Sequence, residues 1–161
     1  MAMAEKTILE ELKQKFPTKV KESFEILGDE VVVIERGFLL SLMTALKNKP
    51  YEFTMLLDLT CVDYTGQDPR FEMVYHLFSL PHNRRLRIKT RLTEEDATID
   101  SLVPLWKNAN WLEREVYDMF GVGFNGHPDL RRLLMYDGFE GYPLRKEYPL
   151  RKRQPIIPVR K

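Results

Sequence analysis

The sequence predicts an α+β fold, with an antiparallel or mixed sheet of about four to five strands covered by helices and followed by an extended C-terminal arm. Two segments before residue 50 repeat apolar side chains at helical spacing, and three strand-like runs come after them. Residues 121–161 keep many apolar side chains but lose all periodicity. We therefore expect an α+β globular domain at residues 1–120 and an extended partner-binding arm at residues 121–161.

The first part of the chain is predicted to hold two amphipathic helices with a hairpin between them. The first helix covers residues 5–16 and is stopped by Pro17. Two apolar runs on either side of Gly28 predict a hairpin within residues 24–34. The second helix covers residues 38–46 and ends before a proline.

Three strand-like runs follow, at residues 54–64, 71–80 and 84–92. In the last run, apolar residues alternate with the basic residues Arg85, Arg87, Lys89 and Arg91. This alternation predicts a strand with one buried face and one basic face. The basic face is either an ordinary solvated surface or a rim for an acidic partner, and we favour the solvated surface.

A short helix is predicted near residues 99–107, and a longer helix after it. Asn110 is placed to cap the longer helix, and Glu113 three positions further on resembles a capping box. The apolar residues of this helix form a stripe, and Gly121 is placed to end it.

The charge of the chain is balanced overall but uneven along its length. Its 25 basic and 24 acidic residues give a net charge of +1, which excludes a global field toward nucleic acid or a membrane. Residues 144–161, in contrast, hold seven basic residues and one acid. Cys61 is the only cysteine, so an internal disulfide, a cysteine-rich zinc site and an iron–sulfur ligand set are excluded. We expect a reducing compartment, and we find no signal peptide or membrane-spanning segment.

Chemically active side chains are densest within residues 113–132. The helical part of this segment contains Glu113, Arg114, Glu115 and Asp118. These four suit acid–base catalysis, a metal site with His127, or a charge network with Arg131 and Arg132. We favour the charge network, because the two glutamates point to different sides of the helix and no histidine-based metal motif occurs.

His127 precedes a proline in a glycine-rich turn, where hydrogen bonding that orders the turn is favoured over proton transfer. A small acid–base enzyme using His127 with Glu115 or Asp118 stays as an alternative. A nucleic-acid binder working through residues 151–153 is a weaker one, because this basic cluster is small and no RNA or DNA motif accompanies it. No phosphate loop or catalytic triad motif is present. From the residues alone, an interaction subunit fits better than an enzyme.

Three runs of residues resemble the signature of one family. They are Glu-Arg-Glu-x-x-Asp-Met-Phe-Gly at 113–121, Phe-x-Gly-His-Pro-Asp-Leu-Arg-Arg-Leu-Leu at 124–134, and Gly-Tyr-Pro-Leu-Arg-Lys-Glu-Tyr-Pro-Leu at 141–150. The family is that of the C-subunit of the proton-pumping NADH:quinone oxidoreductase, the 30 kDa subunit family of respiratory complex I. The three runs are highly specific, and the order of predicted helices and strands before them also fits.

The resemblance implies a non-catalytic scaffolding and assembly subunit in the peripheral arm of this complex, one that supports electron transfer to quinone. It implies no cofactor in this chain, since FMN and the iron–sulfur clusters belong to other subunits. The implied partners are the quinone-site subunit (49 kDa or D) and neighbouring iron–sulfur subunits, with membrane contact only through the complex and no nucleic acid. The implied location is the cytoplasmic side of the bacterial inner membrane. The alternative is an equivalent subunit of a related complex with another electron donor, of ferredoxin, F420 or hydrogenase type.

The resemblance also implies which residues matter, as structural and interface residues and not as catalytic, cofactor-binding or metal-binding ones. They are Glu113, Arg114, Glu115, Asp118, His127, Pro128, Asp129, Arg131, Arg132, Pro143, Leu144, Arg145, Lys146 and Pro149. We expect the charged residues of the helix to pair with Arg131 and Arg132 and so to set the angle at which the arm leaves the domain. We expect the leucines and tyrosines of the arm to be buried against the partner.

Overall fold

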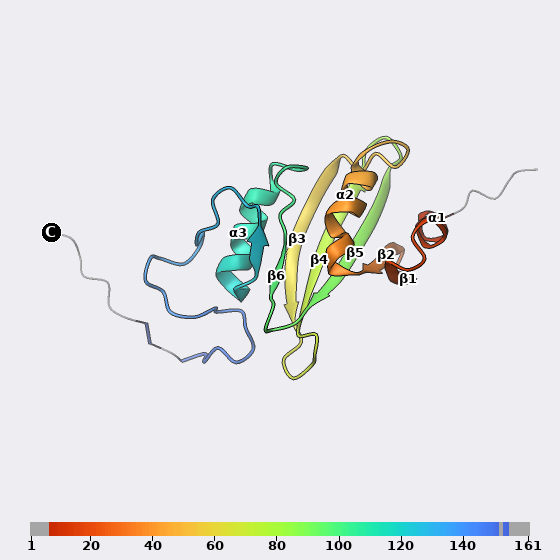
Figure 1. Ribbon diagram of the computed structural model, residues 1–161. Helices are drawn as coiled ribbons and strands as arrows, with labels where there is room; N and C mark the ends of the chain where they lie inside the picture. The colour runs from red at the N-terminus through yellow and green to blue at the C-terminus, as the bar shows by residue number, and fades with distance from the viewer. Residues whose placement is uncertain (1–6, 152, 155–161) are drawn as a thin grey trace, which may run out of the picture.

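The structure is a computed structural model that describes residues 7–151, 153 and 154. Figure 1 shows how its helices and strands are arranged. In chain order they are α1 (Ile8–Lys15), β1 (Val20–Ile26), β2 (Asp29–Ile34), the 3-10 turn η1 (Arg36–Phe38), α2 (Leu39–Lys47), β3 (Met55–Asp63), β4 (Phe71–Ser79), β5 (Arg84–Leu92), β6 (Thr98–Asp100), α3 (Ala109–Phe120) and β7 (Gly123–Asn125).

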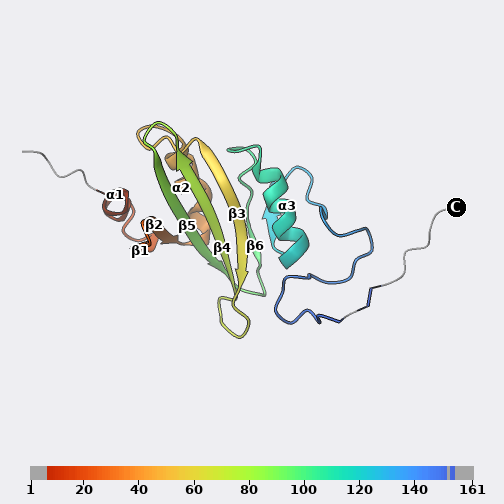
Figure 2. The same ribbon diagram turned by 180° about the vertical axis from the view of Figure 1, so that it is seen from behind.

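The five long strands form one mixed sheet in the order β1-β2-β5-β4-β3. β2 and β5 are parallel, and the other neighbouring pairs are antiparallel. Helix α2 lies over one face of this sheet, and α3 lies beside its β3 end (Figure 1). Seen from behind, the opposite face has no helix in front of it (Figure 2). The predicted α+β class, with a mixed sheet of about five strands, is confirmed.

The core lies between the sheet and the helices on its covered face. Many apolar residues of the strands are buried, as are four of the six apolar residues of α2. Burial of these side chains is the main favourable term in the folding of the domain. Among the largest fully buried side chains are Tyr75, Phe53, Phe71, Leu39, Leu42, Met43 and Leu46.

The predictions for the first half of the chain are confirmed within a few residues. Helix α1 begins at Ile8 because the Thr7 side chain accepts the Glu10 N–H, and residues 5 and 6 lie outside the described residues. The hairpin between β1 and β2 turns through Leu27 and Gly28, which both have positive φ angles, of 53° and 84°. Two such residues give the turn that matches the twist of an antiparallel hairpin.

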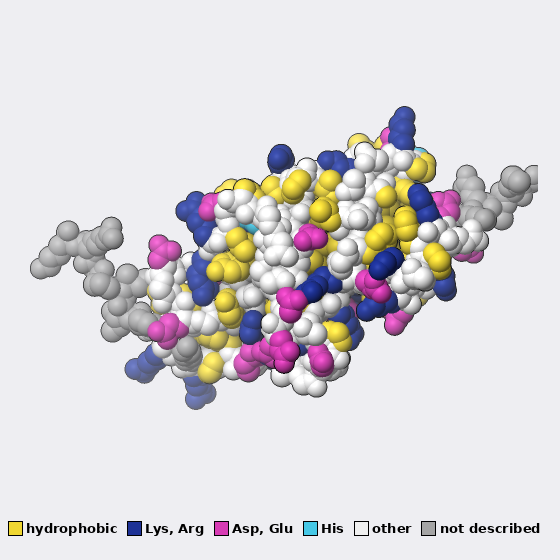
Figure 3. All heavy atoms as spheres, viewed as in Figure 1, with side chains coloured by type: hydrophobic (Ala, Val, Ile, Leu, Met, Phe, Trp, Pro, Cys, Tyr) yellow, Lys and Arg dark blue, Asp and Glu magenta, His cyan; other side chains and the backbone are white. Residues whose placement is uncertain are grey.

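The basic face predicted for β5 exists, but its charges are largely paired. Arg87 pairs with Asp29 of β2, and Lys89 and Arg91 both reach Glu72 of β4. Basic and acidic side chains lie close together across the surface seen in Figure 3 as well. The basic residues of β5 are therefore mostly engaged in ion pairs with neighbouring strands. The prediction considered only a solvated face or a rim for an acidic partner, and it missed these pairs.

The predicted short helix at residues 99–107 is wrong. Residues 98–100 form β6, which pairs in parallel with β7, and turns follow. In one of these turns the Leu102 carbonyl accepts from the N–H groups of Leu105 and Trp106. β6 is a strand because it pairs with β7, which lies more than twenty residues further along the chain. The sequence around β6 gives no indication of this pairing. Among the described residues, no helix is long and apolar enough to cross a membrane.

Candidate functional site: helix α3 and the C-terminal arm

Helix α3 begins on the edge of the sheet, without the predicted cap. Asn108 precedes the helix, and its Nδ2 donates to the Leu56 carbonyl at 2.7 Å. Trp106 Nε1 donates to the Thr54 carbonyl at 3.1 Å. Both bonds therefore use carbonyls on the free edge of β3 or just before it. Asn110 lies inside the helix, so the predicted cap and capping box are wrong.

The end of α3 is set by Gly121, as predicted. Its φ is 76°, and its N–H donates to the Tyr117 carbonyl at 2.9 Å. A Cβ at this position would lie 2.5 Å from the Tyr142 ring. Gly121 thus reverses the chain and lets the arm pack closely on the end of the helix.

The fully buried carboxylate of Asp118 holds the arm against α3. Its Oδ2 accepts the backbone N–H groups of Leu133, Leu134 and Met135 at 3.0, 2.8 and 2.8 Å. Its Oδ1 accepts from Arg132 Nη1 at 2.7 Å. Burial alone would raise the pKa of Asp118, but these donors together hold it below its ordinary value.

The Arg114 side chain binds backbone carbonyls in the same stretch of the arm. Its Nε donates to the Arg131 carbonyl at 3.1 Å and its Nη2 to the Arg132 carbonyl at 3.0 Å. Its guanidinium also lies 5.1 Å from the centre of the Trp111 ring. The guanidinium is therefore held between the helix and the backbone of the arm.

Only one ion pair of the predicted network is present among the described residues, between Asp118 and Arg132. Arg131 instead pairs with Asp129 at 2.9 Å, and both of these side chains are exposed. Glu115 is exposed as well. The prediction missed the main contact, in which the Asp118 carboxylate accepts three backbone N–H groups of the arm. It considered only ion pairs with the arginines.

Glu113 is turned inward, away from the arm's arginines. Its Oε2 accepts from Ser101 Oγ at 2.7 Å, and its Oε1 accepts the Leu102 N–H at 2.6 Å. These bonds tie α3 to the loop after β6. Burial raises the pKa of Glu113 to about 7, and the two donors only partly oppose this rise.

His127 orders the turn that follows β7, as favoured from the sequence. Its Nδ1 accepts the Asp129 N–H at 3.0 Å, and its Nε2 faces the Asn110 carbonyl at 3.2 Å. This arrangement needs the ring hydrogen on Nε2. The Glu113 carboxylate is 4.0 Å from Nε2, and both side chains are fully buried. Since backbone groups engage both ring nitrogens, the geometry does not favour acid–base chemistry with Glu115 or Asp118. Pro128, in the same turn, is exposed.

A second cluster, centred on Arg70, holds the later part of the arm. Arg70 binds the buried carboxylate of Asp63 through Nε at 2.8 Å and Nη2 at 2.9 Å. It also pairs with Glu94 and with Glu147 of the arm. Asp63 Oδ2 in turn accepts the Lys146 N–H at 2.8 Å. The Arg70 hydrogen bonds lower the pKa of Asp63 to about 2.

The predicted residues 143–149 thus lie against this chain's own domain. The Leu144 N–H donates to the Met119 carbonyl at 3.1 Å, and Arg145 Nε donates to the Phe120 carbonyl at 2.6 Å. The Arg145 guanidinium stacks on the Tyr142 ring at 4.7 Å. Pro143 is half-buried and Pro149 is exposed.

Sequence reasoning missed Arg70, Asp63 and Glu94, although they bind the arm. Arg70 and Glu147 are separated by 77 positions, and no local pattern links them. A hint existed in the strongly apolar run that precedes Asp63, because a carboxylate at the end of a buried strand needs a cation.

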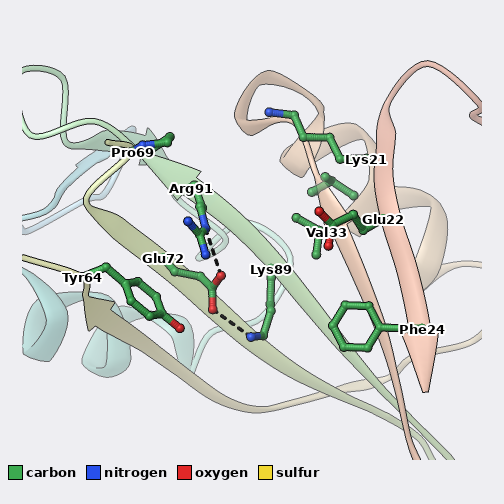
Figure 4. Close-up of a pocket in the computed structure, with 10 residues that line it drawn as sticks. Lys21, Glu22, Phe24, Val33, Tyr64, Pro69, Glu72, Lys89 and Arg91 are labelled. Atoms are coloured by element: carbon green, nitrogen blue, oxygen red, sulfur yellow. Dashed lines mark hydrogen bonds and ion pairs between the residues drawn. The ribbon is translucent and has the colours of Figure 1, made fainter. Parts of the chain in front are cut away.

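The described residues contain no group of three or more histidine, cysteine, aspartate or glutamate side chains that could hold a metal ion. A groove of about 410 Å³ is lined by residues of β1, β2, β4 and β5 together with Tyr64 and Pro69. Within it the Glu72 carboxylate lies between Lys89 and Arg91, with Tyr64 and Phe24 to either side (Figure 4). The Glu72 carboxylate thus serves both cations, and the groove holds none of the predicted site residues.

Residues 32–154 match the model of the family described as the 30 kDa subunit of respiratory-chain NADH dehydrogenase. The chain belongs to this family. The NADH-quinone oxidoreductase C-subunit of Citrifermentans bemidjiense is 45% identical, over 85% of this chain and 84% of its own length. The mitochondrial NADH-ubiquinone oxidoreductase 30.4 kDa subunit of Neurospora crassa is 45% identical, over 81% of this chain and 46% of its own. The resemblance drawn from the three sequence runs is confirmed.

Solved structures agree with membership of the 30 kDa subunit family. A trypsin-resistant fragment (1–134) of Nqo5 is 36% identical, with a TM-score of 0.66, over 76% of this chain and 96% of that chain. A chain of the membrane-bound sulfane sulfur reductase, an archaeal respiratory membrane complex, has a TM-score of 0.74 at 23% identity, over 89% of this chain and 84% of that chain. This second likeness shows a shared fold alone.

We expect Asp118→Ala to lower the free energy of unfolding by roughly 3–5 kcal/mol, because it leaves Arg132 and three backbone N–H groups without their acceptor. Trypsin should then cleave faster after Arg131 and Arg132. The matched control, Asp129→Ala, breaks an exposed pair and should cost less than about 1 kcal/mol. Equal losses for the two variants would contradict the role given to Asp118.

Arg70→Ala should lower the thermal midpoint by about 10 °C, because it leaves the buried Asp63 carboxylate unpaired. Arg84→Ala, which removes an exposed partner of Glu30, should shift the midpoint by no more than about 4 °C. Calorimetry of both variants measures this. Cleavage by trypsin after Arg145 and Lys146 should accelerate only in Arg70→Ala, and unchanged cleavage there would show that this cluster does not hold the arm.

Glu113 should make stability fall as the pH rises. Its pKa is about 7 in the folded chain against an ordinary value of 4.5, so folding retains a proton that the unfolded chain releases between these values. Its contribution is therefore fullest below pH 4.5 and is lost as the pH rises through 7. Relative to Glu113→Gln, the unsubstituted chain should lose about 2 kcal/mol between about pH 5 and pH 8. Parallel pH profiles from urea unfolding of the two proteins would contradict this assignment.

Proposed function

We propose that this chain is a non-catalytic scaffolding subunit of the peripheral arm of a proton-pumping NADH:quinone oxidoreductase, in which it packs on the quinone-site subunit and supports electron transfer to quinone. The observation that carries the proposal is the construction of the C-terminal arm. Buried charges fix the arm near residue 118 and near residue 63, while Leu134, Leu144 and Leu150 point large apolar surface outward. Ordered apolar side chains on a surface are typical of a protein interface.

The relatives' names support the choice of complex. The bacterial C-subunit and the mitochondrial 30.4 kDa subunit are parts of NADH:quinone or NADH:ubiquinone oxidoreductases. Neighbouring iron–sulfur subunits are the further proposed partners, on the cytoplasmic side of the bacterial inner membrane. In this proposal the chain works without a cofactor of its own, contacts the membrane only through the complex and binds no nucleic acid.

The rival small enzyme receives no support from the site. The Asp118 carboxylate already binds the arm, Glu115 is exposed, and His127 orders its turn through backbone groups. None of these three side chains lines the groove of about 410 Å³ described above.

Deleting the whole arm would not test this function cleanly, because Val122 and Phe124 are buried in the core of the domain. Asp118→Ala is the sharper variant, with Asp129→Ala as its control. We expect Asp118→Ala to reduce the amount of assembled complex in native membranes while leaving NADH:quinone turnover per assembled complex unchanged. Blue-native gels with activity staining, normalised to complex content, measure both quantities.

If the complex with Asp118→Ala assembled normally but lost NADH:quinone turnover, this result would contradict the scaffold proposal. It would favour a catalytic role for this helix.

A further inference from the structure

The outer side of α3 and the first turn of the arm together form one continuous strip of surface. Arg114 lies between the Trp111 ring and the carbonyls of Arg131 and Arg132. Four positions further along the helix, Asp118 binds the N–H of Leu134. Because positions 111, 114 and 118 share one side of a helix, residues 131–134 run alongside that side. We call this strip, made of Trp111, Arg131 and Leu134, the α3–arm strip.

The two apolar residues of the strip are exposed and yet held in place. Trp111 is 60% exposed and Leu134 is 58% exposed. The Arg114 guanidinium stacks on the Trp111 ring, and Asp118 fixes the backbone of Leu134. A large side chain that is ordered before binding loses little conformational entropy when it binds. Tryptophan and arginine are also the residues most often found at the energetic centre of protein interfaces.

The charges of the strip indicate the chemistry of its partner. The Arg131 side chain is 71% exposed and pairs with Asp129, which is itself exposed, so its guanidinium can exchange partners at little cost. Residues 131–161 carry nine basic and three acidic side chains. A partner surface with acidic side chains would therefore be electrostatically complementary to this part of the chain.

A lipid surface fits the strip less well than a protein does. Glu115 lies one helical turn after Trp111 and is exposed, and the exposed Asp129 lies beside Arg131. Anionic lipid headgroups attract basic segments, and they would repel both of these carboxylates. A protein pocket can instead take the indole and leave these carboxylates at its solvated rim.

We propose that the α3–arm strip is a docking surface for another subunit, which receives Trp111 and Leu134 in an apolar pocket and presents carboxylates to Arg131. This deepens the proposed function and rests on it. Trp111 is the central contact of the interface, and Arg131 sets the orientation of the partner. The interior-facing side of the same helix is buried in this chain.

The test is recovery of other subunits with the tagged full-length chain from gently solubilised native membranes. Trp111→Ala should lower this recovery at least about tenfold, as expected for a tryptophan at an interface centre. Arg131→Glu should lower it as well, and more at low salt than at high salt. Leu80→Ala, which shortens another exposed leucine, is the matched control and should leave recovery unchanged. The purified variants should keep thermal midpoints within about 4 °C of the unsubstituted chain, which excludes misfolding as the cause.

A photo-crosslinking residue at position 111 or 134 should label the same partner subunit, and one at position 80 should not. Labelling of lipid, or of a second copy of this chain, would contradict the proposal. Undiminished recovery with Trp111→Ala, beside normal recovery with the unsubstituted chain, would overturn the inference and leave the proposed function standing. Failure of the unsubstituted chain to recover any other subunit would contradict both.

Discussion

The buried carboxylate of Asp118 is the interaction on which the rest of this structure depends. It accepts three backbone N–H groups and one guanidinium, and so meets the arm where the arm has no regular structure of its own. A carboxylate without partners at this depth would be costly, and so would three N–H groups without acceptors. The Asp118 carboxylate and the N–H groups of the arm therefore satisfy each other, and the arm folds back along α3.

Other features of the arm follow from this contact and add to it. Gly121 must turn the chain tightly for residues 133–135 to reach Asp118, and Arg114 holds the preceding carbonyls. Further on, the Arg70 cluster binds Lys146 and Glu147 to the end of β3. The arm thus contributes buried polar bonds to its own domain, packs Leu130 and Met135 against the core and leaves Leu134, Leu144 and Leu150 exposed. This division explains how a segment without periodicity can be ordered and still offer surface to a partner.

The sequence allowed the elements with a local signal to be predicted, and the others not. Helical spacing located α1, α2 and α3, and alternation located β5 with its buried and basic faces. The three runs in residues 113–150 identified the family. The pairing of β6 with β7 escaped prediction because a three-residue strand is defined by its partner. Glu113 was assigned to a cap, yet it binds Ser101 and Leu102, and only the folded chain brings that loop to it.

The arm's attachment to its own domain before any partner binds is the central claim, and amide hydrogen exchange of the isolated full-length chain tests it most directly. The N–H groups of Leu133, Leu134 and Met135 should exchange at least about a hundredfold more slowly than unstructured amides, because exchange requires them to leave Asp118. Protection at all three positions would show that the arm is folded on its own domain. Exchange at the rate of an unstructured chain would contradict the account, since the arm would then be ordered only by its partner.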